Sequence, residues 1–435
     1  MRKIFTSKQS IGISAALIVL AVSAFFMVNV ELPPWSHWVS GINVIVFAVP
    51  AFLAATRWAG NRAAVILFVL LGSLALLIES SAIITGFPYG HFGYSGLLGF
   101  KLFGSVPWTV ALAWTPLVLA AFAIARVLSD RAALRIFIAA FILLLFDLAL
   151  DPGAVKLGFW QYADGGSFYG VPVSNFLGWI VSGTVAAIVL EAFAHILKPL
   201  LPVPVQLISS SFFIIFFWTC IAVFGEMLLP AAIGFAVLIV FAAIYRKHHY
   251  AFDEMIVMVN EENDPIATER RSAAHNHETK LHRAFSVFLF NSRGELLLQR
   301  RALTKKTWPG VWSNSCCGHP MLFESVEDAA IRRLRYELGI KIASLQIVLP
   351  DFRYRAEKDG IVENELCPVL VGFTEEQPVL NSAEVAEILW VKWGDALKLI
   401  SDPANGYSPW AVQEALLLNR SEAFNDLIFK MAASR

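Results

Sequence analysis

Charged side chains are scarce in the first 250 of the 435 residues. This part holds 21 Lys, Arg, Asp and Glu residues, whereas the 185 residues that follow hold 47. So little charge over so long a stretch excludes an ordinary soluble domain there, while the second part has the composition of one. The sequence therefore predicts two domains, a membrane domain over residues 1–250 and a soluble domain over residues 251–435.

Cysteine is also scarce, and neither part carries an excess of positive charge. The four cysteines are Cys220, Cys316, Cys317 and Cys367. The adjacent pair cannot easily bridge to each other, so no disulfide framework is expected. The net charge of zero argues against a nucleic-acid partner, which would need a basic face. The chain also has no internal repeat and no low-complexity tract.

What the first part has instead is a series of long apolar runs. About 20 apolar residues cross the hydrocarbon core of a bilayer as a helix. The first run follows the basic residues 1–8 and is too long for the apolar core of a signal peptide, so we expect it to stay as a helix. The sequence predicts an all-α polytopic membrane domain of about eight transmembrane helices, near residues 11–31, 40–56, 63–85, 106–126, 133–151, 174–196, 207–227 and 230–246.

Lys and Arg are distributed unevenly over the loops between these runs. If the N-terminus is inside the cell, only Lys101 and Lys156 fall on the outer side, and the other basic residues fall on the cytoplasmic side. Cytoplasmic loops of membrane proteins are enriched in Lys and Arg. We therefore expect a multi-pass protein of the cytoplasmic membrane, with the N-terminus and the soluble domain in the cytoplasm.

Beyond residue 250 the pattern changes to short strands and amphipathic helices. Charged and apolar residues alternate at helical spacing over 324–338, and Gly339 follows as a stop signal, while a terminal helix begins at Pro409. The order of these elements predicts an α+β domain rather than a doubly wound parallel sheet. The predicted strands lie near residues 255–259, 284–290, 296–299, 366–373 and 388–393.

Several motifs of the soluble domain occur in one fixed order. They read RRAL at 300–303, WPGVWSNSCCGHP at 308–320, RRLRYELG at 332–339, DFRYR at 351–355, VENE at 362–365 and SPW at 408–410. Over about residues 255–430 the chain closely resembles type I isopentenyl-diphosphate isomerases of the Nudix superfamily. The resemblance implies a soluble α+β Nudix fold and the isomerisation of isopentenyl diphosphate to dimethylallyl diphosphate.

The general Nudix signature is incomplete here. Arg333 and Tyr336 stand at two positions where Nudix hydrolases carry acidic residues that bind metal. Their presence argues against the alternative that the domain hydrolyses diphosphates, and the isomerases share this departure. The residues that still match the signature are Gly318, Glu324, Arg332, Leu334, Glu337, Gly339 and Ile340.

Moving a carbon–carbon double bond requires one proton delivered and another removed two carbons away. The tertiary cation between these steps needs an acid and a base on opposite faces of a dry pocket. The resemblance implies that Cys317 and Glu365 are these two groups and that Tyr354 assists Glu365. It also implies that Trp410 offers its ring face to the cation, an attraction of roughly 0.5–2 kcal/mol.

Imidazole and carboxylate groups of the soluble domain have the makings of a metal site. Three imidazoles with two carboxylates suit Mn, Zn or Fe, and a carboxylate-rich site tolerates Mg. The resemblance implies Mn or Mg at His275, His282, His319, Glu363 and Glu365, and a second Mg between Glu337 and the substrate diphosphate. It further implies that the diphosphate is bound by Arg271, Arg301, Lys305 and Arg333.

The membrane domain carries carboxylates inside its predicted spans, where ionisable groups are costly and usually functional. Asp147 and Asp151 are four residues apart and share one helix face, and Glu79 lies near the outer end of its own span. We expect these three carboxylates to converge near the outer interface if their helices pack, with one of them held protonated as a general acid.

Two outer segments, residues 86–105 and 151–173, are rich in glycine and aromatic residues. With FDLALDP at 146–152 and YGVPVSNFLGW at 169–179, they resemble the membrane carotenoid 1,2-hydratases, which include bisanhydrobacterioruberin hydratase. The resemblance covers about residues 40–245. It implies addition of water to an acyclic carotenoid end group, with Glu79, Asp147 and Asp151 as acid and base, and with His91 and Asn175 orienting water.

The leading interpretation is thus a bifunctional fusion within isoprenoid and carotenoid biosynthesis. Its expected partners are an isoprenoid diphosphate, an acyclic carotenoid and the lipid bilayer. One alternative makes the membrane domain only an anchor or an interaction platform, which its buried carboxylates argue against. Another makes that domain a transporter, but no pair of broken helices or matching halves supports this.

Overall fold

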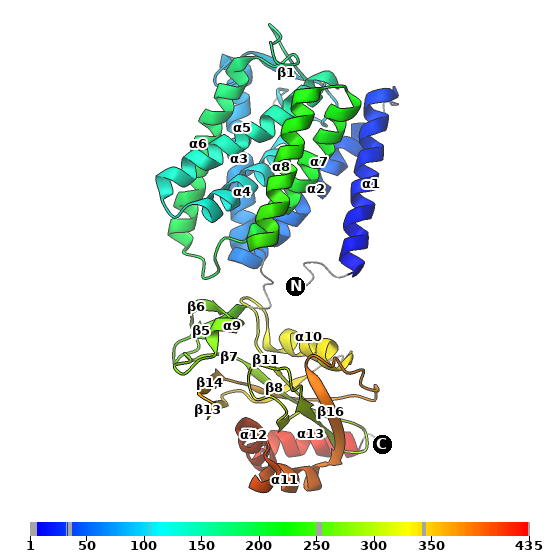
Figure 1. Ribbon diagram of the computed structural model, residues 1–435, viewed down its shortest axis with the longest axis vertical. Coiled ribbons are helices and arrows are strands. Elements are labelled where there is room, and N and C mark those ends of the chain that lie inside the picture. The colour runs from blue at the N-terminus through cyan, green and yellow to red at the C-terminus, as the bar shows by residue number, and fades with distance from the viewer. Residues whose placement is uncertain are drawn as a thin grey trace. The chain divides into compact units, whose positions relative to one another are not determined.

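The computed structural model describes residues 7–248 and 255–433, apart from residues 32, 34–36, 103 and 342–344. The chain splits into two compact units, Met1–Tyr250 and Ala251–Arg435. The predicted domain boundary after residue 250, and most of the basic segment 1–8, lie outside the described residues. Helices build the first unit, whereas strands with helices around them build the second (Figure 1).

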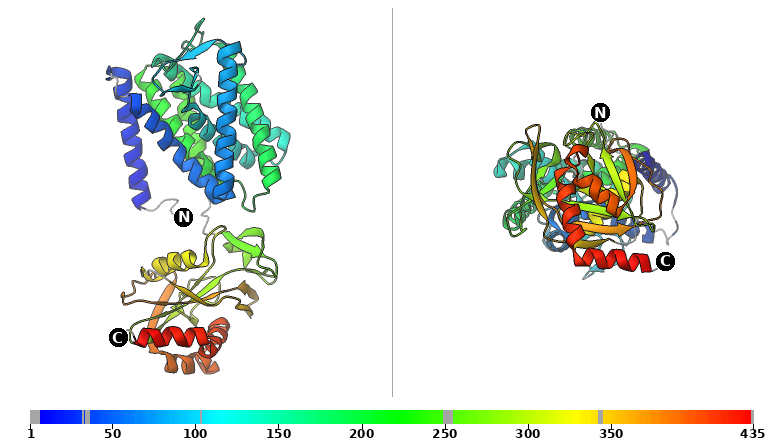
Figure 2. Two further views of the ribbon diagram at one scale, coloured as in Figure 1. Left: turned by 180° about the vertical axis from the view of Figure 1, so that it is seen from behind. Right: turned by 90° about the horizontal axis from the view of Figure 1, so that it is seen from below.

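Within the described part of the first unit, eight helices are long and apolar enough to cross a membrane, which confirms the predicted polytopic helical domain. Over the most apolar stretch of each helix, the buried share is 72% in α4 but only 6% in α1. The views from the front and from behind both place α1 at the edge of the bundle (Figure 1 and Figure 2). The eight helices are α1 (Ser7–Asn29), α2 (His37–Ala59), α3 (Asn61–Thr85), α4 (Val110–Leu128), α5 (Ala132–Lys156), α6 (Val173–Leu197), α7 (Ser209–Phe224) and α8 (Leu228–His248).

The helix boundaries differ by a few residues from the predicted spans, and a proline lies at two of these differences. The fourth span was expected from residue 106, but Pro107 lies in a short strand and α4 begins at Val110. The last span was expected from residue 230, but α8 begins at Leu228 and contains Pro230. Proline is tolerated in the first turn of a helix, because the N–H groups there have no partner inside the helix.

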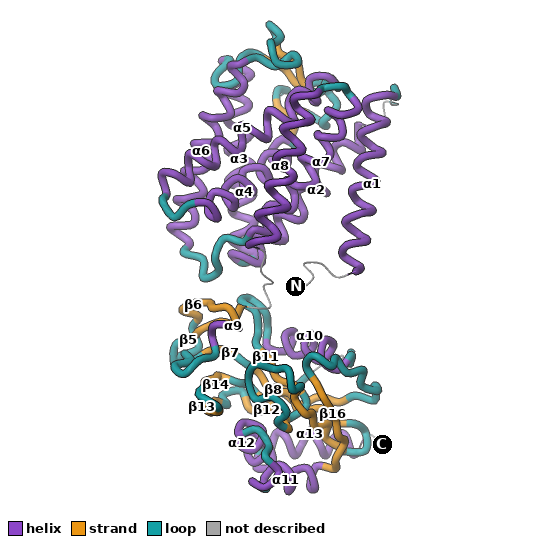
Figure 3. The backbone as a smooth tube through the Cα atoms, in the orientation of Figure 1, coloured by secondary structure: helices purple, strands orange, loops and turns teal. Residues whose placement is uncertain are grey.

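The glycine- and aromatic-rich loops fold into two small sheets at one end of the bundle (Figure 3). Strand β1 (Phe92–Tyr94) pairs with β4 (Trp160–Tyr162), and β2 (Lys101–Leu102) pairs with β3 (Val106–Pro107). The residues before β1 press directly on α6. A Cβ atom on Gly178 would come within 2.6 Å of the Pro88 carbonyl oxygen, so only glycine allows this contact. The loops therefore form a folded cap on this end of the bundle.

The second unit contains two sheets, as expected for an α+β Nudix domain. One sheet has the strand order β10-β9-β8-β15-β12, with β11 paired to β8 and β16 paired to β9, and the other has the order β13-β14-β7-β5-β6. The strands of the first sheet are β8 (Phe285–Phe290), β9 (Glu295–Arg301), β10 (Trp312–Ser313), β11 (Cys316–Gly318), β12 (Gln346–Leu349), β15 (Val369–Phe373) and β16 (Val385–Lys392). Those of the second are β5 (Met255–Val259), β6 (Pro265–Arg270), β7 (His282–Arg283), β13 (Arg353–Lys358) and β14 (Ile361–Leu366).

Helices cover both faces of the larger sheet (Figure 1). Ser325 caps the start of helix α10 (Val326–Leu338), because its side chain accepts a hydrogen bond from the Asp328 N–H. Gly339 follows the helix in the left-handed conformation and caps its end. It packs on one face, and three C-terminal helices pack on the other. The remaining helices of this unit are α9 (Arg271–Ala274), α11 (Trp393–Ser401), α12 (Pro409–Arg420) and α13 (Glu422–Ala433).

Successive residues of a strand point to opposite faces, so the larger sheet separates two hydrophobic cores. Along β8, Phe285 packs with α10 and Phe288 packs with the C-terminal helices. The same alternation places the two adjacent cysteines of β11 on opposite faces of the sheet. Cys316 is fully buried in the core under α10, and Cys317 packs against the other core. The sequence analysis singled out the second of these two thiols.

Candidate functional sites

Four side chains of the second unit bring their donor atoms within 4.8 Å of one another: His275, His282, His319 and Glu365. They come from the end of α9, from β7, from the residue after β11 and from β14, so only the folded chain assembles them. In addition, Glu363 Oε2 lies 3.0 Å from His275 Nε2. The structure therefore brings together all five residues of the predicted metal site.

The outer nitrogen atoms of two of these rings face backbone carbonyls. His275 Nδ1 lies 3.3 Å from the Arg271 carbonyl oxygen, and His282 Nδ1 lies 2.9 Å from that of Lys280. A carbonyl oxygen only accepts, so Nδ1 carries the proton and Nε2 offers a lone pair. Both Nε2 atoms, and Glu363 Oε2, are buried with no hydrogen-bond partner among the described residues. These orphaned donor atoms fit a divalent metal ion.

Glu365 joins this cluster to a tyrosine. Its Oε1 atom lies 3.3 Å from His319 Nε2 and 3.5 Å from His282 Nε2, and its Oε2 atom accepts a hydrogen bond of 2.8 Å from the Tyr354 hydroxyl. Burial disfavours the charged form, but the adjacent His282 and His319 imidazoles outweigh it and hold the pKa of Glu365 well below its usual range. The carboxyl group is therefore ionised at neutral pH.

Cys317 lies on the neighbouring sheet, in a pocket of small polar groups. Its thiol donates a hydrogen bond of 3.0 Å to Asn314 Oδ1 and lies 3.5 Å from Ser286 Oγ. Burial raises the pKa of the thiol to about 12, chiefly because a thiolate would be poorly solvated there. The sulfur consequently keeps its proton at neutral pH.

Aromatic rings connect the thiol to the carboxylate. Asn314 Oδ1, which accepts from Cys317, also accepts a hydrogen bond of 3.3 Å from the Trp410 indole N–H. The Trp410 ring lies 5.5 Å from the Tyr354 ring, which in turn holds Glu365. Trp410 and Tyr354 are both buried. Cys317 and Glu365 therefore lie at the two ends of one buried aromatic wall, which consists of the Trp410 and Tyr354 rings.

The basic residues predicted to hold a diphosphate lie in two groups. Arg301 donates to the backbone carbonyls of residues 307 and 308, at 2.9 and 3.1 Å. Lys305 and Arg333 instead converge on Glu384, at 2.5 and 3.4 Å, and Arg271 adds its charge to the same group. Burial raises the pKa of Glu384, but these cations outweigh it and lower the pKa. The sequence analysis missed Glu384, which lies in no recognised motif.

Glu337, predicted to bind magnesium with the diphosphate, is almost fully buried. Its carboxylate forms an ion pair with Arg333 one helical turn earlier, and Gln299 donates to it at 3.4 Å. The Arg333 charge thus sits where a hydrolase of this fold would carry an acid. The pair leaves Glu337 near the basic residues around Glu384, because Arg333 contacts both carboxylates.

The sequence analysis also missed Glu414, which is fully buried on α12. Its Oε1 atom lies 3.9 Å from Cys367 Sγ, and Ser286 Oγ lies 3.5 Å from the sulfur atoms of both Cys367 and Cys317. Burial raises the pKa of Glu414 to about 8. The spacing could have revealed it, since a residue four positions after Trp410 on a helix shares its face.

The buried Glu414 predicts a pH-dependent stability of the second unit. Between about pH 4.5 and pH 8 the unfolded chain loses this proton while the folded chain keeps it, so the free energy of unfolding falls as pH rises. Glu414→Gln, which has no proton to lose, should flatten this fall and be more stable than wild type at pH 8 by roughly 2–5 kcal/mol. Urea unfolding of residues 251–435 at several pH values measures both curves. Parallel curves for the two proteins would contradict the assignment.

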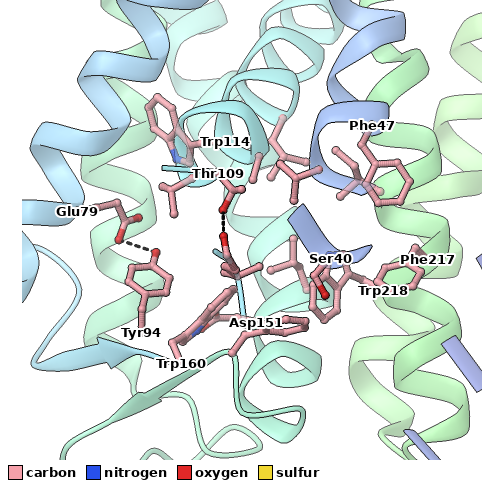
Figure 4. A pocket seen from close by; sticks show the side chains of 18 of the residues that line it. Ser40, Phe47, Glu79, Tyr94, Thr109, Trp114, Asp151, Trp160, Phe217 and Trp218 are labelled. Atoms are coloured by element: carbon pink, nitrogen blue, oxygen red, sulfur yellow. Dashed lines mark hydrogen bonds between the residues drawn. The ribbon is translucent and has the colours of Figure 1, made fainter. Parts of the chain in front are cut away.

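The first unit contains a cavity of about 150 Å³ under the cap. Its lining is largely aromatic, with Phe47, Phe217 and Trp218 on one side and Glu79 and Tyr94 on the other (Figure 4). The Tyr94 hydroxyl donates a hydrogen bond of 3.0 Å to the Glu79 carboxylate. A mostly apolar cavity with a few polar groups is typical of a site for an apolar small molecule.

Asn175 on α6 links the other two carboxylates. Its side-chain amide donates to Asp147 Oδ2 at 2.8 Å and to Asp151 Oδ2 at 3.0 Å, and the Tyr162 hydroxyl also donates to Asp151, at 2.8 Å. Asp151 and Asn175 line the cavity with Glu79, whereas Asp147 lies behind them. The other carboxylate oxygen of Asp147 is buried and has no hydrogen-bond partner among the described residues.

The fifth residue proposed for this site lies elsewhere. His91 is exposed and is not among the residues that line the cavity. Its ring packs beside Gly86, where an added Cβ would lie 2.9 Å from His91 Nε2. The tyrosines that do bind the carboxylates, Tyr94 and Tyr162, were missed. Their signal was the aromatic content of the two cap loops, which the sequence analysis noted without assigning single residues.

Two family models match the chain, and each match lies within one of the two compact units. Residues 39–241 match the family model described as carotenoid biosynthesis protein, and residues 280–410 match the model described as NUDIX domain. These matches confirm a membrane domain of carotenoid biosynthesis followed by a Nudix domain.

Curated relatives match the second unit. The isopentenyl-diphosphate Delta-isomerases of Shigella dysenteriae serotype 1 (strain Sd197) and Escherichia coli (strain K12) are each 49% identical to it over 163 residues, which is 37% of this chain and 90% of the relative. Among solved structures, DR0079 from Deinococcus radiodurans has 20% identity and a TM-score of 0.32, covering 39% of this chain and 99% of that chain. The MutT protein from Methanosarcina mazei Go1 has 20% identity and a TM-score of 0.28, covering 32% and 94%.

Proposed function

The chain belongs, through its second unit, to the isopentenyl-diphosphate Delta-isomerase family, and we propose that this unit converts isopentenyl diphosphate to dimethylallyl diphosphate with Cys317 and Glu365 as its two proton-transferring groups. The observation that carries the proposal is the aromatic wall that has the Cys317 thiol at one end and the Glu365 carboxylate at the other.

Each side chain then has a distinct task. One of the pair delivers a proton to the terminal alkene carbon, and the other removes a proton from the carbon next to the one that becomes cationic. Trp410 lies beside the developing cation and stabilises it with its ring face, and the dry surroundings keep water from capturing it. Tyr354 orients Glu365 through its hydrogen bond of 2.8 Å.

A divalent metal, Mn or Mg, would be held by His275, His282, His319, Glu363 and Glu365. Its charge would lower the proton affinity of Glu365. Arg271, Arg301, Lys305 and Arg333 would bind the substrate diphosphate, and Glu337 would help to hold a magnesium ion that accompanies it. The contacts of Lys305 and Arg333 with Glu384 keep both cations in place before substrate arrives.

The test is a product assay on residues 251–435. We expect conversion of isopentenyl diphosphate to dimethylallyl diphosphate with Mn or Mg, complete loss of conversion with a chelator, and recovery when metal is restored. The relatives support the use of this fragment, because the aligned region makes up 90% of their length. Release of phosphate or pyrophosphate in place of the isomer would instead identify a diphosphate hydrolase.

For the first unit we propose a second activity, the addition of water to the end group of an acyclic carotenoid. The observation that favours it over a plain anchor is the link from Asn175 to Asp147 and Asp151 beside an aromatic cavity. One carboxyl group protonates the terminal alkene to a tertiary cation, and another accepts a proton from the water that captures this cation. Pigment analysis of a carotenoid-producing host that expresses the full chain tests this activity.

The positions of Lys and Arg support a cytoplasmic location for the N-terminus and for the isomerase unit. On this topology Asp151 lies near the outer boundary of the membrane. Accessibility of single introduced cysteines, in residues 86–105 and in the second unit, to a membrane-impermeant reagent on intact cells tests the assignment.

A further inference from the structure

A second cavity of the first unit, of about 740 Å³, lies at the helix ends remote from the cap. Its charged residues come from the last turn of α4, the first turn of α5 and the end of α6. Arg135 and Asp151 lie on one helix, 16 residues apart, which corresponds to roughly 24 Å along the axis. This basic pocket, defined by Arg126, Arg135, Glu191 and Lys198, is therefore separate from the cavity under the cap.

The charges of the basic pocket do not balance. Glu191 accepts two hydrogen bonds from Arg135 and one from Arg126, all of 2.7 Å, so both of its oxygen atoms are engaged. The lining contains Lys198 in addition and no carboxylate besides Glu191. The residues that line the pocket thus carry a surplus of two positive charges.

Unused donors accompany this surplus. Arg126 Nε is buried and has no hydrogen-bond partner within the described part of the chain. Lys198 terminates α6 in the left-handed conformation, and its ammonium group forms no ion pair there either. A guanidinium edge and an ammonium group with free donors suit the oxygen atoms of a phosphate group.

Apart from His195, the rest of the pocket wall is largely apolar. Trp58, Ile136, Ile188 and Leu201 line it, and the Trp58 indole donates a hydrogen bond of 3.1 Å to the Leu201 carbonyl, which fixes the segment after α6. The volume far exceeds the space that a single water molecule needs. A ligand with an anionic head and an apolar chain matches both parts of the wall.

We propose that the basic pocket binds the phosphate head group of an anionic membrane phospholipid, with the start of an acyl chain against Trp58 and Leu201. Basic pockets between transmembrane helices at the cytoplasmic side are suited to such head groups. The bilayer is the source because the pocket lies at the helix ends, where head groups reside. The proposal does not depend on either enzymatic activity.

The experiment uses the full chain in detergent, and it measures the thermal unfolding temperature and, by native mass spectrometry, retained lipid. The probes are phosphatidylglycerol and, as the zwitterionic reference, phosphatidylcholine. We expect wild type to prefer phosphatidylglycerol, and Lys198→Gln to bind it about fivefold more weakly, as for loss of one phosphate contact. The matched control is Arg62→Gln, because Arg62 is exposed at the same end of the bundle and does not line the pocket. It should behave like wild type.

Arg126→Gln removes a second donor but also one partner of Glu191, so Arg126→Lys accompanies it as the variant that keeps the charge. An unfolding temperature in phosphatidylcholine equal to that of wild type shows that each variant folds. Equal retention of both lipids, or an unchanged preference in Lys198→Gln, would overturn the proposal. So would equal protection by inorganic phosphate, or tighter binding of a prenyl diphosphate than of phosphatidylglycerol, since each assigns the pocket to another phosphate source.

Discussion

Cys317→Ala and Glu365→Gln should each lower kcat of the isomerase by roughly 10²- to 10⁴-fold while the unit stays folded. The reason is that each variant removes one of only two groups that exchange protons with the substrate. The two polar groups of the aromatic wall between them are already engaged, since the Trp410 indole donates to Asn314 and the Tyr354 hydroxyl donates to Glu365. The measurement is single-turnover conversion of isopentenyl diphosphate.

The neighbouring thiol supplies a matched control. Cys316→Ala removes the same atom one residue earlier, but Cys316 faces the core under α10 and should keep kcat near that of wild type at the cost of some stability. Glu363→Gln is the control for the carboxylate, because Glu363 contacts His275 and not Tyr354. It should weaken metal binding more than kcat at saturating metal. Near-normal turnover in Cys317→Ala or Glu365→Gln would remove the basis for the proton-transfer roles.

Asp151→Asn should abolish the hydrated carotenoid in a pigment-producing host, a fall of about 10²-fold or more. The amide has nearly the shape of the carboxyl group, but it cannot give or accept a proton. Asp151 is the best single choice because it lines the cavity and accepts hydrogen bonds from both Asn175 and Tyr162. The measurement is the ratio of hydrated to unhydrated pigment at equal amounts of membrane-inserted protein.

Asp164→Asn is the control for this experiment. It changes a carboxylate of the same cap loop that is exposed and lies outside the cavity lining. Its pigment ratio should equal that of wild type. If Asp151→Asn leaves the ratio unchanged while wild type is active, the acid–base assignment fails. If wild type itself leaves every acyclic carotenoid unaltered, the unit is an anchor or a platform.

Local pattern and motif predicted much of both units. Length and apolarity located all eight membrane helices, because a span must be about 20 apolar residues whatever it packs against. The strand ends were less certain, since the break at Cys367 and Pro368 divides a run that looks continuous in sequence. The metal-site residues were predictable only through the family resemblance, because His282 and Glu365 are far apart in sequence and meet through the pairing of β7 with β14.

The residues that were missed share a physical cause. Glu384 and Glu414 matter through partners far away in sequence, Lys305 in the first case and Cys367 in the second. The spacing from Trp410 indicates the helix face of Glu414, but no local period identifies the contacts themselves, because they depend on how sheets and helices pack. His91 is the opposite case. Its place in a loop rich in glycine and aromatic residues suggested a role in the site, but the residue is exposed and does not line the cavity.

The opposite orientations of Cys316 and Cys317 restrict how this region can change in evolution. Insertion or deletion of one residue in the short segment that forms β11 would exchange the two sulfurs between the core under α10 and the aromatic wall. Cys316 would then take the place of Cys317 beside the aromatic wall, although the amino-acid composition would hardly change. Length variation should therefore be excluded from this segment and confined to surface loops, such as the one around Gly360.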